Sequence, residues 1–144
     1  MKAISLWQPW ASAVALGWKS NETRHWSTKY RGPIAIHAAK KWTIEERVAA
    51  IDATKETGDR RLVDPPRGVI VATAVLVGIE RTEDLLPRIR GTIEDWFGNY
   101  APGRFAWKLE RISRLAIPIP FTGRQGLFDV PDSVFGTAME ARHG

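Results

Sequence analysis

The amino-acid sequence predicts an α+β domain in which a small, partly closed mixed β-barrel carries two or three flanking helices. Three observations lead to this expectation. The chain has 144 residues, enough for one domain with its own core. Short β-prone segments recur along it and are separated by only two clearly helical segments. Strands and helices do not alternate regularly, as a doubly wound sheet requires.

The start of the chain predicts a strand, a helix and an extended segment. Polar and apolar residues alternate over residues 2–7, which favours a short strand. Pro9 suits the first turn of a helix, so the alanine-rich residues 9–17 are expected to be helical up to Gly17. Residues 20–26 are expected to be extended or turn-like.

A further strand is expected over residues 34–39, after a turn. Successive side chains of a strand point to opposite faces of its sheet. Ile34 and Ile36 should therefore share one face, and Ala35 and His37 should share the other.

The best helical segment covers residues 43–58. Thr43 can cap its N-terminus, Glu45 and Glu46 lie in its first turn, and Gly58 ends it. Three apolar residues at helical spacing form the stripe by which this helix is expected to pack, namely Ile44, Val48 and Ile51.

The middle of the chain predicts the main strand of the sheet. Residues 68–79 are rich in β-branched side chains and almost all apolar, so we expect this strand to be central. A short helix over residues 82–90 is expected to break at Pro87. Residues 96–103 are aromatic and contain glycine, which is typical of a loop.

The last part of the chain predicts two more strands. Residues 104–116 alternate between polar and apolar side chains. The prolines within residues 118–123 do not suit a central strand, so this segment is expected at an edge or in a connector. Residues 124–131 contain a final short strand, and a loose tail follows.

The composition excludes several kinds of chemistry. There is no cysteine, which rules out disulfides, thiolate nucleophiles and cysteine-ligated zinc. Only three histidines are present and none has a partner at ligand spacing, so neither a metal nor another cofactor is expected. No stretch approaches the roughly 20 apolar residues of a membrane span. We therefore expect a cytoplasmic protein without a membrane partner.

Charge and aromatic content favour a nucleotide-like ligand. The net charge of +5 suits such a ligand or a polyanion, although an ordinary basic surface would also explain it. Seven tryptophans are unusual for this length. An indole face can stack on a nucleobase and contribute about 1–3 kcal/mol per base. The candidates for stacking, some of which are expected in the core instead, are Trp7, Trp10, Trp26 and Trp96.

Charged and aromatic residues are concentrated in the stretch "ALGWKSNETRHW". Lys19, Glu22 and Arg24 lie there within a few positions, beside Thr23 and two tryptophans. The stretch is compatible with a solvated surface turn or with a polar site that has aromatic walls.

Six short motifs, in order, resemble the ASCH domain family, whose fold is similar to that of PUA RNA-binding domains. They are "LWQPWA", "GWKSNETR", "YRGPIAIHAAK", "PRGVIVATAVL", "YAPGRFAW" and "GRQGLF". The second fits the family signature G-x-K-x-x-E-x-R at Gly17, Lys19, Glu22 and Arg24. The resemblance implies one ASCH domain over residues 1–144.

The resemblance implies two kinds of function. Some members of the family are RNA- or DNA-binding modules, and others are small amidohydrolases that release the acyl group of N(4)-acetylcytidine. In those enzymes a lysine of the signature works with a threonine three residues later and with a distant glutamate. The lysine is Lys19 here, but the position three residues later is Glu22, and Thr23 follows it. Either Glu80 or Glu94 could be the distant acid.

Hydrolysis of an amide needs a nucleophile, a proton shuttle and stabilisation of the oxyanion. Lys19 is expected as the general base, because a lysine shielded from water releases its proton more readily. Glu22 could activate a water molecule or simply pair with a neighbouring cation. In an extended segment Thr23 points away from Glu22, so water activated by Glu22 is preferred to Thr23 as the nucleophile.

The remaining predicted site residues would bind the substrate. Arg24 offers a planar fork of donors for a carbonyl, a base edge or a phosphate. Gln8 has a donor and an acceptor on one amide and could read the edge of a pyrimidine. Trp10 and Trp26 could stack on the base. His37 is a further candidate, although a histidine satisfied within the barrel is the simpler explanation.

The sequence thus predicts an amidohydrolase that needs no metal and converts N(4)-acylcytidine or N(4)-acylcytosine into cytidine or cytosine and a carboxylic acid. Its partner would be a nucleoside or a nucleobase. The alternatives are a non-catalytic RNA-binding module and a ribonuclease that uses the same basic cleft. The range of acyl groups, the preferred form of the substrate and the oligomeric state stay open.

Overall fold

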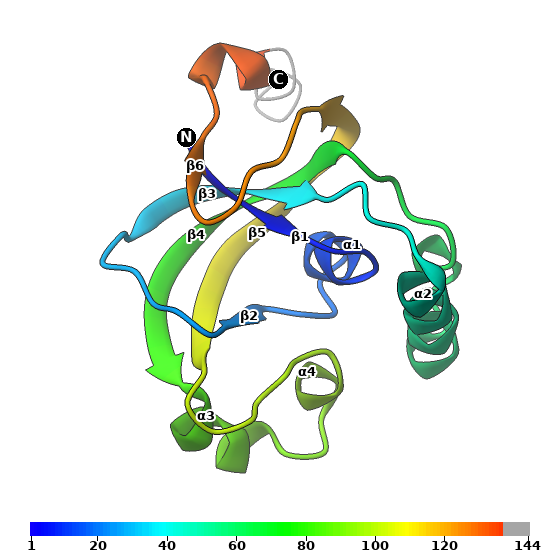
Figure 1. Ribbon diagram of the computed structural model, residues 1–144, viewed down its shortest axis with the longest axis vertical. Coiled ribbons are helices and arrows are strands. Elements are labelled where there is room, and N and C mark those ends of the chain that lie inside the picture. Colours follow the sequence, from blue (N-terminus) through cyan, green and yellow to red (C-terminus); the bar gives the residue numbers. More distant parts are fainter. Residues whose placement is uncertain (137–144) are drawn as a thin grey trace.

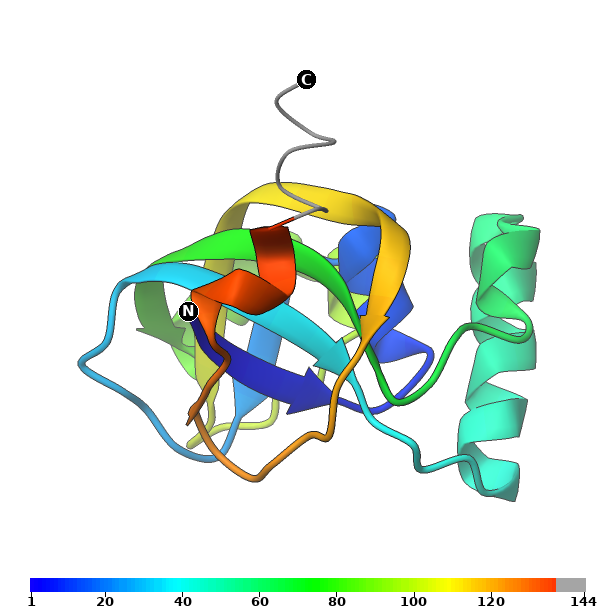
Figure 2. The same ribbon diagram turned by 90° about the horizontal axis from the view of Figure 1, so that it is seen from above.

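The computed structural model of the protein describes residues 1–136, which form a strongly curved mixed sheet with helices around it (Figures 1 and 2). The six strands of the sheet lie in the order β2-β5-β4-β3-β1-β6, and the edge strands β2 and β6 are not hydrogen-bonded to each other. This open arrangement confirms the predicted α+β fold class. The strands are β1 (Lys2–Leu6), β2 (Asn21–Arg24), β3 (Gly32–Ala38), β4 (Val69–Arg81), β5 (Phe105–Pro120) and β6 (Phe128–Asp129).

Four α-helices and two short 3-10 helices accompany the sheet in residues 1–136. They are α1 (Trp10–Ala15), α2 (Ile44–Thr57), η1 (Arg60–Leu62), α3 (Thr82–Ile89), α4 (Ile93–Trp96) and η2 (Asp132–Phe135). The additional helix, α4, is a single turn whose N-cap Thr92 accepts a hydrogen bond from the Asp95 amide. None of the described helices is long and apolar enough to cross a membrane.

The central position predicted for the strand over residues 68–79 is confirmed, because β4 pairs with β3 on one side and with β5 on the other. Both pairings are antiparallel, whereas β1 runs parallel to β3. The long strands β4 and β5 bend at several irregularities in their pairing, and this bending curves the sheet.

The proline-rich end of β5 lies at an edge, as expected. The segment pairs with β4 through Ile119 and Pro120, but β2 covers β5 only from Phe105 to Lys108. Proline has no N–H to donate to a neighbouring strand, so Pro118 and Pro120 are tolerated where one side of the strand is unpaired.

The two faces of β3 contribute to two different cores. Ile34 and Ile36 belong to the cluster inside the curved sheet, which also contains the fully buried Trp107. Ala35 belongs to the second cluster, with Phe128. Helix α1 adds to the inner cluster by packing against β3, β4 and β5. The predicted alternation along this strand is therefore confirmed.

The predicted packing face of α2 is wrong. The helix stands at the periphery, with α1 between it and the strands (Figures 1 and 2). Its buried apolar residues are Ala50 and Ala53, and the small side chain of Ala53 belongs to the cluster around Phe97. Glu46 is buried on the same face. The predicted stripe faces solvent, and its exposed fractions are 73% for Ile44, 50% for Val48 and 46% for Ile51.

The N-terminus of α2 explains this orientation. The amide and the hydroxyl of Thr43 both donate to the Glu46 carboxylate, at 3.0 Å from Oε1. Burial opposes ionisation of Glu46, but the hydrogen bonds from Thr43 outweigh it and hold the pKa of Glu46 below its usual value. The buried capping carboxylate thus turns the alanine face inward and the apolar stripe outward.

The expected break at Pro87 is also wrong, since α3 continues through Pro87 to Ile89. Pro87 is the sixth residue of the eight in this helix. The missing proline N–H therefore removes only one bond near the end of a short helix, and two further residues remain helical. The predicted tail beyond residue 136 lies outside the described residues.

The packing of α2 can be tested with the same substitution at two positions. We expect Ala53→Asn to lower the free energy of unfolding by about 2 kcal/mol or more, because it buries an unpartnered amide in a filled contact. Ile51→Asn introduces the same residue into the same helix on the exposed side and should cost less than about 1 kcal/mol. Thermal and urea unfolding measure both values. Equal losses would show that the apolar stripe carries the packing.

Candidate functional site

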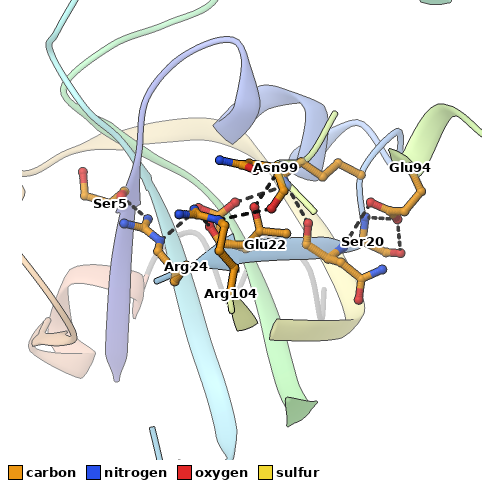
Figure 3. Close-up of polar contacts among 10 residues, drawn as sticks. Ser5, Ser20, Glu22, Arg24, Glu94, Asn99 and Arg104 are labelled. Atoms are coloured by element: carbon orange, nitrogen blue, oxygen red, sulfur yellow. Dashed lines mark hydrogen bonds and ion pairs between the residues drawn. The ribbon is translucent and has the colours of Figure 1, made fainter. Parts of the chain in front are cut away.

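A row of three charged side chains forms the centre of the candidate site (Figure 3). Glu22 Oε1 lies 3.1 Å from Lys19 Nζ, and Glu22 Oε2 lies 3.1 Å from Arg24 Nε. One carboxylate is thus shared between two cations. Lys19 is only 1% exposed, and its ammonium also donates to the backbone carbonyl of Asn21.

Local structure brings these side chains together. Helix α1 ends at Ala15, and the chain turns towards β2 at Gly17, whose φ of 86° is readily adopted only by glycine. Because β2 is extended, Glu22 and Arg24 point to the same side. Lys19 comes from the turn before the strand and reaches Glu22 from the interior.

Glu94 on α4 holds the turn in place (Figure 3). Its Oε1 accepts hydrogen bonds from the amide and the hydroxyl of Ser20, at 2.7 and 2.6 Å. Its Oε2 lies 3.3 Å from the amide of Asn21. Since Lys19 bonds to the carbonyl of Asn21, Glu94 positions the backbone that in turn positions Lys19.

The charged row opens into a cavity of about 450 Å³, within the usual range for small-molecule sites. Aromatic side chains from two distant parts of the chain form its walls. Trp7 and Trp10 come from the end of β1 and from α1, and Trp96 and Phe97 come from α4 and the residue after it. Trp7 is 53% exposed and Trp96 is 43% exposed, so both indoles lie at the entrance.

Arg104, just before β5, is a further cation in the cavity wall. Its Nε donates to the carbonyl of Asn99, and its Nη2 donates to the carbonyl of Thr23, both at 3.2 Å. The hydroxyl of Thr23 accepts from the amide of Asn99 at 3.2 Å. These bonds fasten the segment after α4 to β2 and fix the guanidinium at the cavity (Figure 3).

Close backbone packing shapes this segment. A Cβ added to Gly98 would lie 2.3 Å from the ring of Tyr100, so no larger residue fits there without a shift. Tyr100 is 4% exposed, and its hydroxyl has no partner among the described residues. Burial, followed by the charges of Glu94, Asp95 and Glu22, raises the pKa of Tyr100 above its usual value. Tyr100 therefore stays neutral beside the site.

The site retains unused hydrogen-bonding capacity. Arg24 Nη2 donates to the carbonyl of Ser5 at 2.6 Å. Arg24 Nε is buried and, despite its proximity to Glu22, has no aligned acceptor in residues 1–136. The arrangement therefore combines a proton acceptor, fixed cations and stacking surfaces in one hollow.

Several predicted residues line this cavity, namely Trp10, Lys19, Glu22, Thr23 and Arg24, together with the stacking candidates Trp7 and Trp96. Thr23 contributes from the opposite side of β2, and its hydroxyl is used by Asn99. The preference for Glu22 over Thr23 as the group that acts with water stays a prediction, and this geometry favours it.

Two predicted substrate-binding residues have structural roles instead. Gln8 is fully buried, and its amide bonds to Ser12 and to the carbonyl of Pro66, so it cannot read a ligand. His37 lies between the hydroxyl of Ser5 and the carbonyl of Phe121, at 2.8 and 2.7 Å. Burial lowers the pKa of His37, although the bond to the Phe121 carbonyl opposes this.

Trp26 and Glu80 are also placed elsewhere. Trp26 packs edge-to-face on Trp107 with ring centroids 4.8 Å apart, and its carbonyl accepts from the Trp107 indole. It therefore packs against the inner core cluster and does not line the cavity. The Glu80 carboxylate, near the end of β4, pairs with Arg88 at 2.6 Å and does not line the cavity.

Sequence reasoning assigned no role to Asn99 and Arg104, which close the cavity from the far part of the chain. Both lie in or beside the motif "YAPGRFAW", so the resemblance marked this region without showing what it contacts. Glu94, one of the two suggested distant acids, lies behind Ser20 and outside the cavity lining. Within residues 1–136, no group of three or more acidic or histidine side chains could hold a metal ion.

Comparison with known proteins identifies relatives of this chain. A family model of the ASCH domain matches residues 4–106. The crystal structure of ASCH from Zymomonas mobilis superposes with a TM-score of 0.60 at 18% identity, covering 97% of this chain and 93% of that one.

Two mutants of the Zymomonas mobilis protein have similar folds. A serine-to-alanine mutant has a TM-score of 0.60 at 19% identity, covering 97% of this chain and 94% of that one. A tyrosine-to-phenylalanine mutant has a TM-score of 0.59 at 18% identity, covering 96% of each chain. These likenesses concern the fold. A search of curated protein sequences found no match.

The ion pair between Lys19 and Glu22 can be tested through stability. We expect Glu22→Gln to lower the free energy of unfolding by about 3 kcal/mol, because it leaves a buried ammonium without its carboxylate. Lys19→Met should cost less, since Glu22 keeps Arg24. Urea unfolding of both variants and of the double variant gives the coupling between the two residues. Strict additivity of the two losses would contradict the pairing.

Proposed function

This chain belongs to the ASCH domain family, and we propose that it is a hydrolase that removes the acyl group from N(4)-acylcytidine or N(4)-acylcytosine. Membership of this family is compatible with a hydrolase or with an RNA-binding role. One observation carries the choice of hydrolase. A carboxylate flanked by two cations, Glu22 between Lys19 and Arg24, lies in a cavity of nucleoside size with aromatic walls.

The walls of the cavity support a nucleobase as the bound group. Trp7, whose ring centre lies 3.6 Å from the Lys41 ammonium, and Trp96 are half-exposed, and Trp10 also lines the cavity. A pyrimidine ring stacked on one of these indoles would direct its polar edge towards the charged row. The guanidinium of Arg24, which lines the cavity, could then donate to a carbonyl of the base or of the acyl group.

The proposed reaction is a hydrolysis by water. Glu22 accepts a proton from the water molecule, whose oxygen bonds to the carbonyl carbon of the acyl group. Negative charge develops on the carbonyl oxygen, where Lys19 and Arg24 stabilise it. Glu22 then delivers the proton to the exocyclic nitrogen, the carbon–nitrogen bond breaks, and the amine and a carboxylic acid leave.

This proposal gives Lys19 a different role from the one expected from the sequence. The Lys19 ammonium donates to the carbonyl of Asn21 and is paired with Glu22, and both contacts require its protons. A fixed, protonated donor is the role that fits these contacts, and in this proposal the Glu22 carboxylate accepts the proton. The general-base role of Lys19 is the competing hypothesis.

The second candidate function is an RNA-binding module, favoured by the number of cations in the cavity wall. Lys19, Arg24 and Arg104 face a single lining carboxylate, Glu22. A module of this kind would hold one base in the cavity and bind phosphates around it. Its affinity would fall steeply with salt, whereas binding of a neutral nucleoside would hardly respond.

The hydrolase proposal is tested by incubating the protein with N(4)-acetylcytidine in the presence of a chelator and following cytidine by chromatography. We expect turnover, and we expect Glu22→Gln to reduce it by about 10²–10⁴-fold, the usual contribution of acid–base help. Glu45→Gln, at an exposed position on α2, is the matched control and should keep the full rate. No turnover by the unmodified protein, together with tight salt-sensitive RNA binding, would reject the hydrolase and support the RNA-binding module.

The role of Lys19 is tested separately with Lys19→Met, which keeps the length of the side chain and removes its charge. We expect a lower kcat with a similar affinity for cytidine, because the developing oxyanion loses a donor. Circular dichroism first establishes that the variant is folded. If Lys19 were the general base, Glu22→Gln would still lose activity at acid pH in the profile of kcat. Only the variant with both residues replaced would lack this acid limb. Loss of that limb in Glu22→Gln alone supports the proposed roles.

A further inference from the structure

The charges that line the cavity do not balance. Three cations, Lys19, Arg24 and Arg104, face one carboxylate, that of Glu22. The nearby carboxylate of Glu94 does not line the cavity, and it accepts three hydrogen bonds from the turn before β2. A neutral nucleoside brings no negative charge into this hollow. The excess of positive charge therefore indicates an anionic group on the ligand.

Of the three cations in the cavity wall, Arg104 is the one that has no counter-ion among residues 1–136. No carboxylate of residues 1–136 lies within ion-pair distance of its guanidinium, whereas Arg61, Arg67 and Arg88 each pair with one. Two backbone carbonyls, those of Thr23 and Asn99, hold Nη2 and Nε of Arg104. They orient the group without neutralising it, so its charge is available at the cavity.

Arg24 provides a second guanidinium on the same side of the site (Figure 3). Its Nη2 is bound to the carbonyl of Ser5, and its Nε is the buried donor without an aligned acceptor. Both arginines are thus held by backbone carbonyls from different elements and line one cavity. Guanidinium groups are well suited to the oxygens of a phosphate, and Arg104 supplies the charge that no carboxylate in residues 1–136 balances.

We propose that the ligand of this cavity is a phosphorylated pyrimidine nucleotide, whose phosphate is bound by Arg104 with support from Arg24. The inference rests on the proposed function for the identity of the base and adds the phosphate as a determinant of specificity. The same chemistry is offered by the phosphate of a free mononucleotide and by a phosphodiester in RNA. The volume of about 450 Å³ accommodates one nucleotide unit, with its base on the indoles and its phosphate on Arg104.

The test measures binding by calorimetry, independently of hydrolysis, with cytidine and with cytidine 5′-monophosphate. We expect the monophosphate to bind about tenfold more tightly or better, which is the order expected for hydrogen bonds to a charged group. Raising the salt concentration should weaken the binding of the monophosphate and leave the binding of cytidine almost unchanged. Arg104→Gln should abolish the preference, which is read as the ratio of the two affinities in the same variant because Arg104 also ties the segment after α4 to β2.

A matched control is available at Arg31. This exposed arginine is also held by two backbone carbonyls, those of Thr28 and Tyr30, and does not line the cavity. Arg31→Gln should leave the preference for the monophosphate intact. Arg104→Lys keeps the charge but loses the planar fork, and it should keep part of the preference. Thermal unfolding of each variant identifies any loss of fold.

Equal affinities for cytidine and its monophosphate, absence of binding by either, or an unchanged preference in Arg104→Gln would overturn the inference. A preference for the monophosphate without turnover of N(4)-acetylcytidine or its 5′-monophosphate would leave the phosphate site standing and would reject the proposed hydrolase. The dinucleotide CpC and a short cytidine-rich RNA separate the two sources of phosphate. Much tighter binding of the RNA points to a phosphodiester, and equal or weaker binding points to the free nucleotide.

Discussion

The burial of a lysine ammonium is the constraint on which the site depends. Lys19 is 1% exposed, and an unpaired charge in such a position is strongly unfavourable. Glu22 supplies the balancing carboxylate, and the carbonyl of Asn21 accepts a hydrogen bond from the ammonium. Both partners lie on β2. The turn after α1 must therefore lead into this four-residue strand in one fixed register. Its pairing with β5 then fixes Arg24 beside Glu22.

The cavity is a junction between two parts of the chain that are distant in sequence. The segment from β1 to β2 supplies the charged row and two indoles, and the segment from α4 to the start of β5 supplies Trp96 and Arg104. Glu94 and Arg104 bond to backbone groups of the first segment, at Ser20 and Thr23. Polar side chains on backbone groups therefore hold the two walls together, and a shift of either wall would alter the charged row.

Helix α2 shows how a buried charge can override hydrophobic periodicity. Glu46 accepts from Thr43 and is buried with the alanine face of the helix. The apolar stripe consequently faces solvent, although its spacing is typical of a packed face. Small residues carry the contact because the cluster around Phe97 and Leu62 already fills the space beside the helix. The hydrophobicity of a side chain alone did not indicate which face would pack.

The sequence by itself determined the fold class, the central strand over residues 68–79 and the edge position of the proline-rich segment. These follow from local properties, namely β-branched runs, alternation and the missing N–H of proline. It also grouped Lys19, Glu22 and Arg24, because a strand brings alternate residues to one side.

Only the tertiary structure decided which other residues reach that group. Gln8 and His37 carry chemistry that suits a ligand, but their polar groups bond to neighbours in the fold, and Trp26 packs on Trp107 outside the cavity lining. Arg104 lies 80 positions beyond Arg24 in the chain, and its role depends on two carbonyls and on the absence of a carboxylate in the described structure. Such a role is a property of surroundings in space, which no local pattern of residue types encodes.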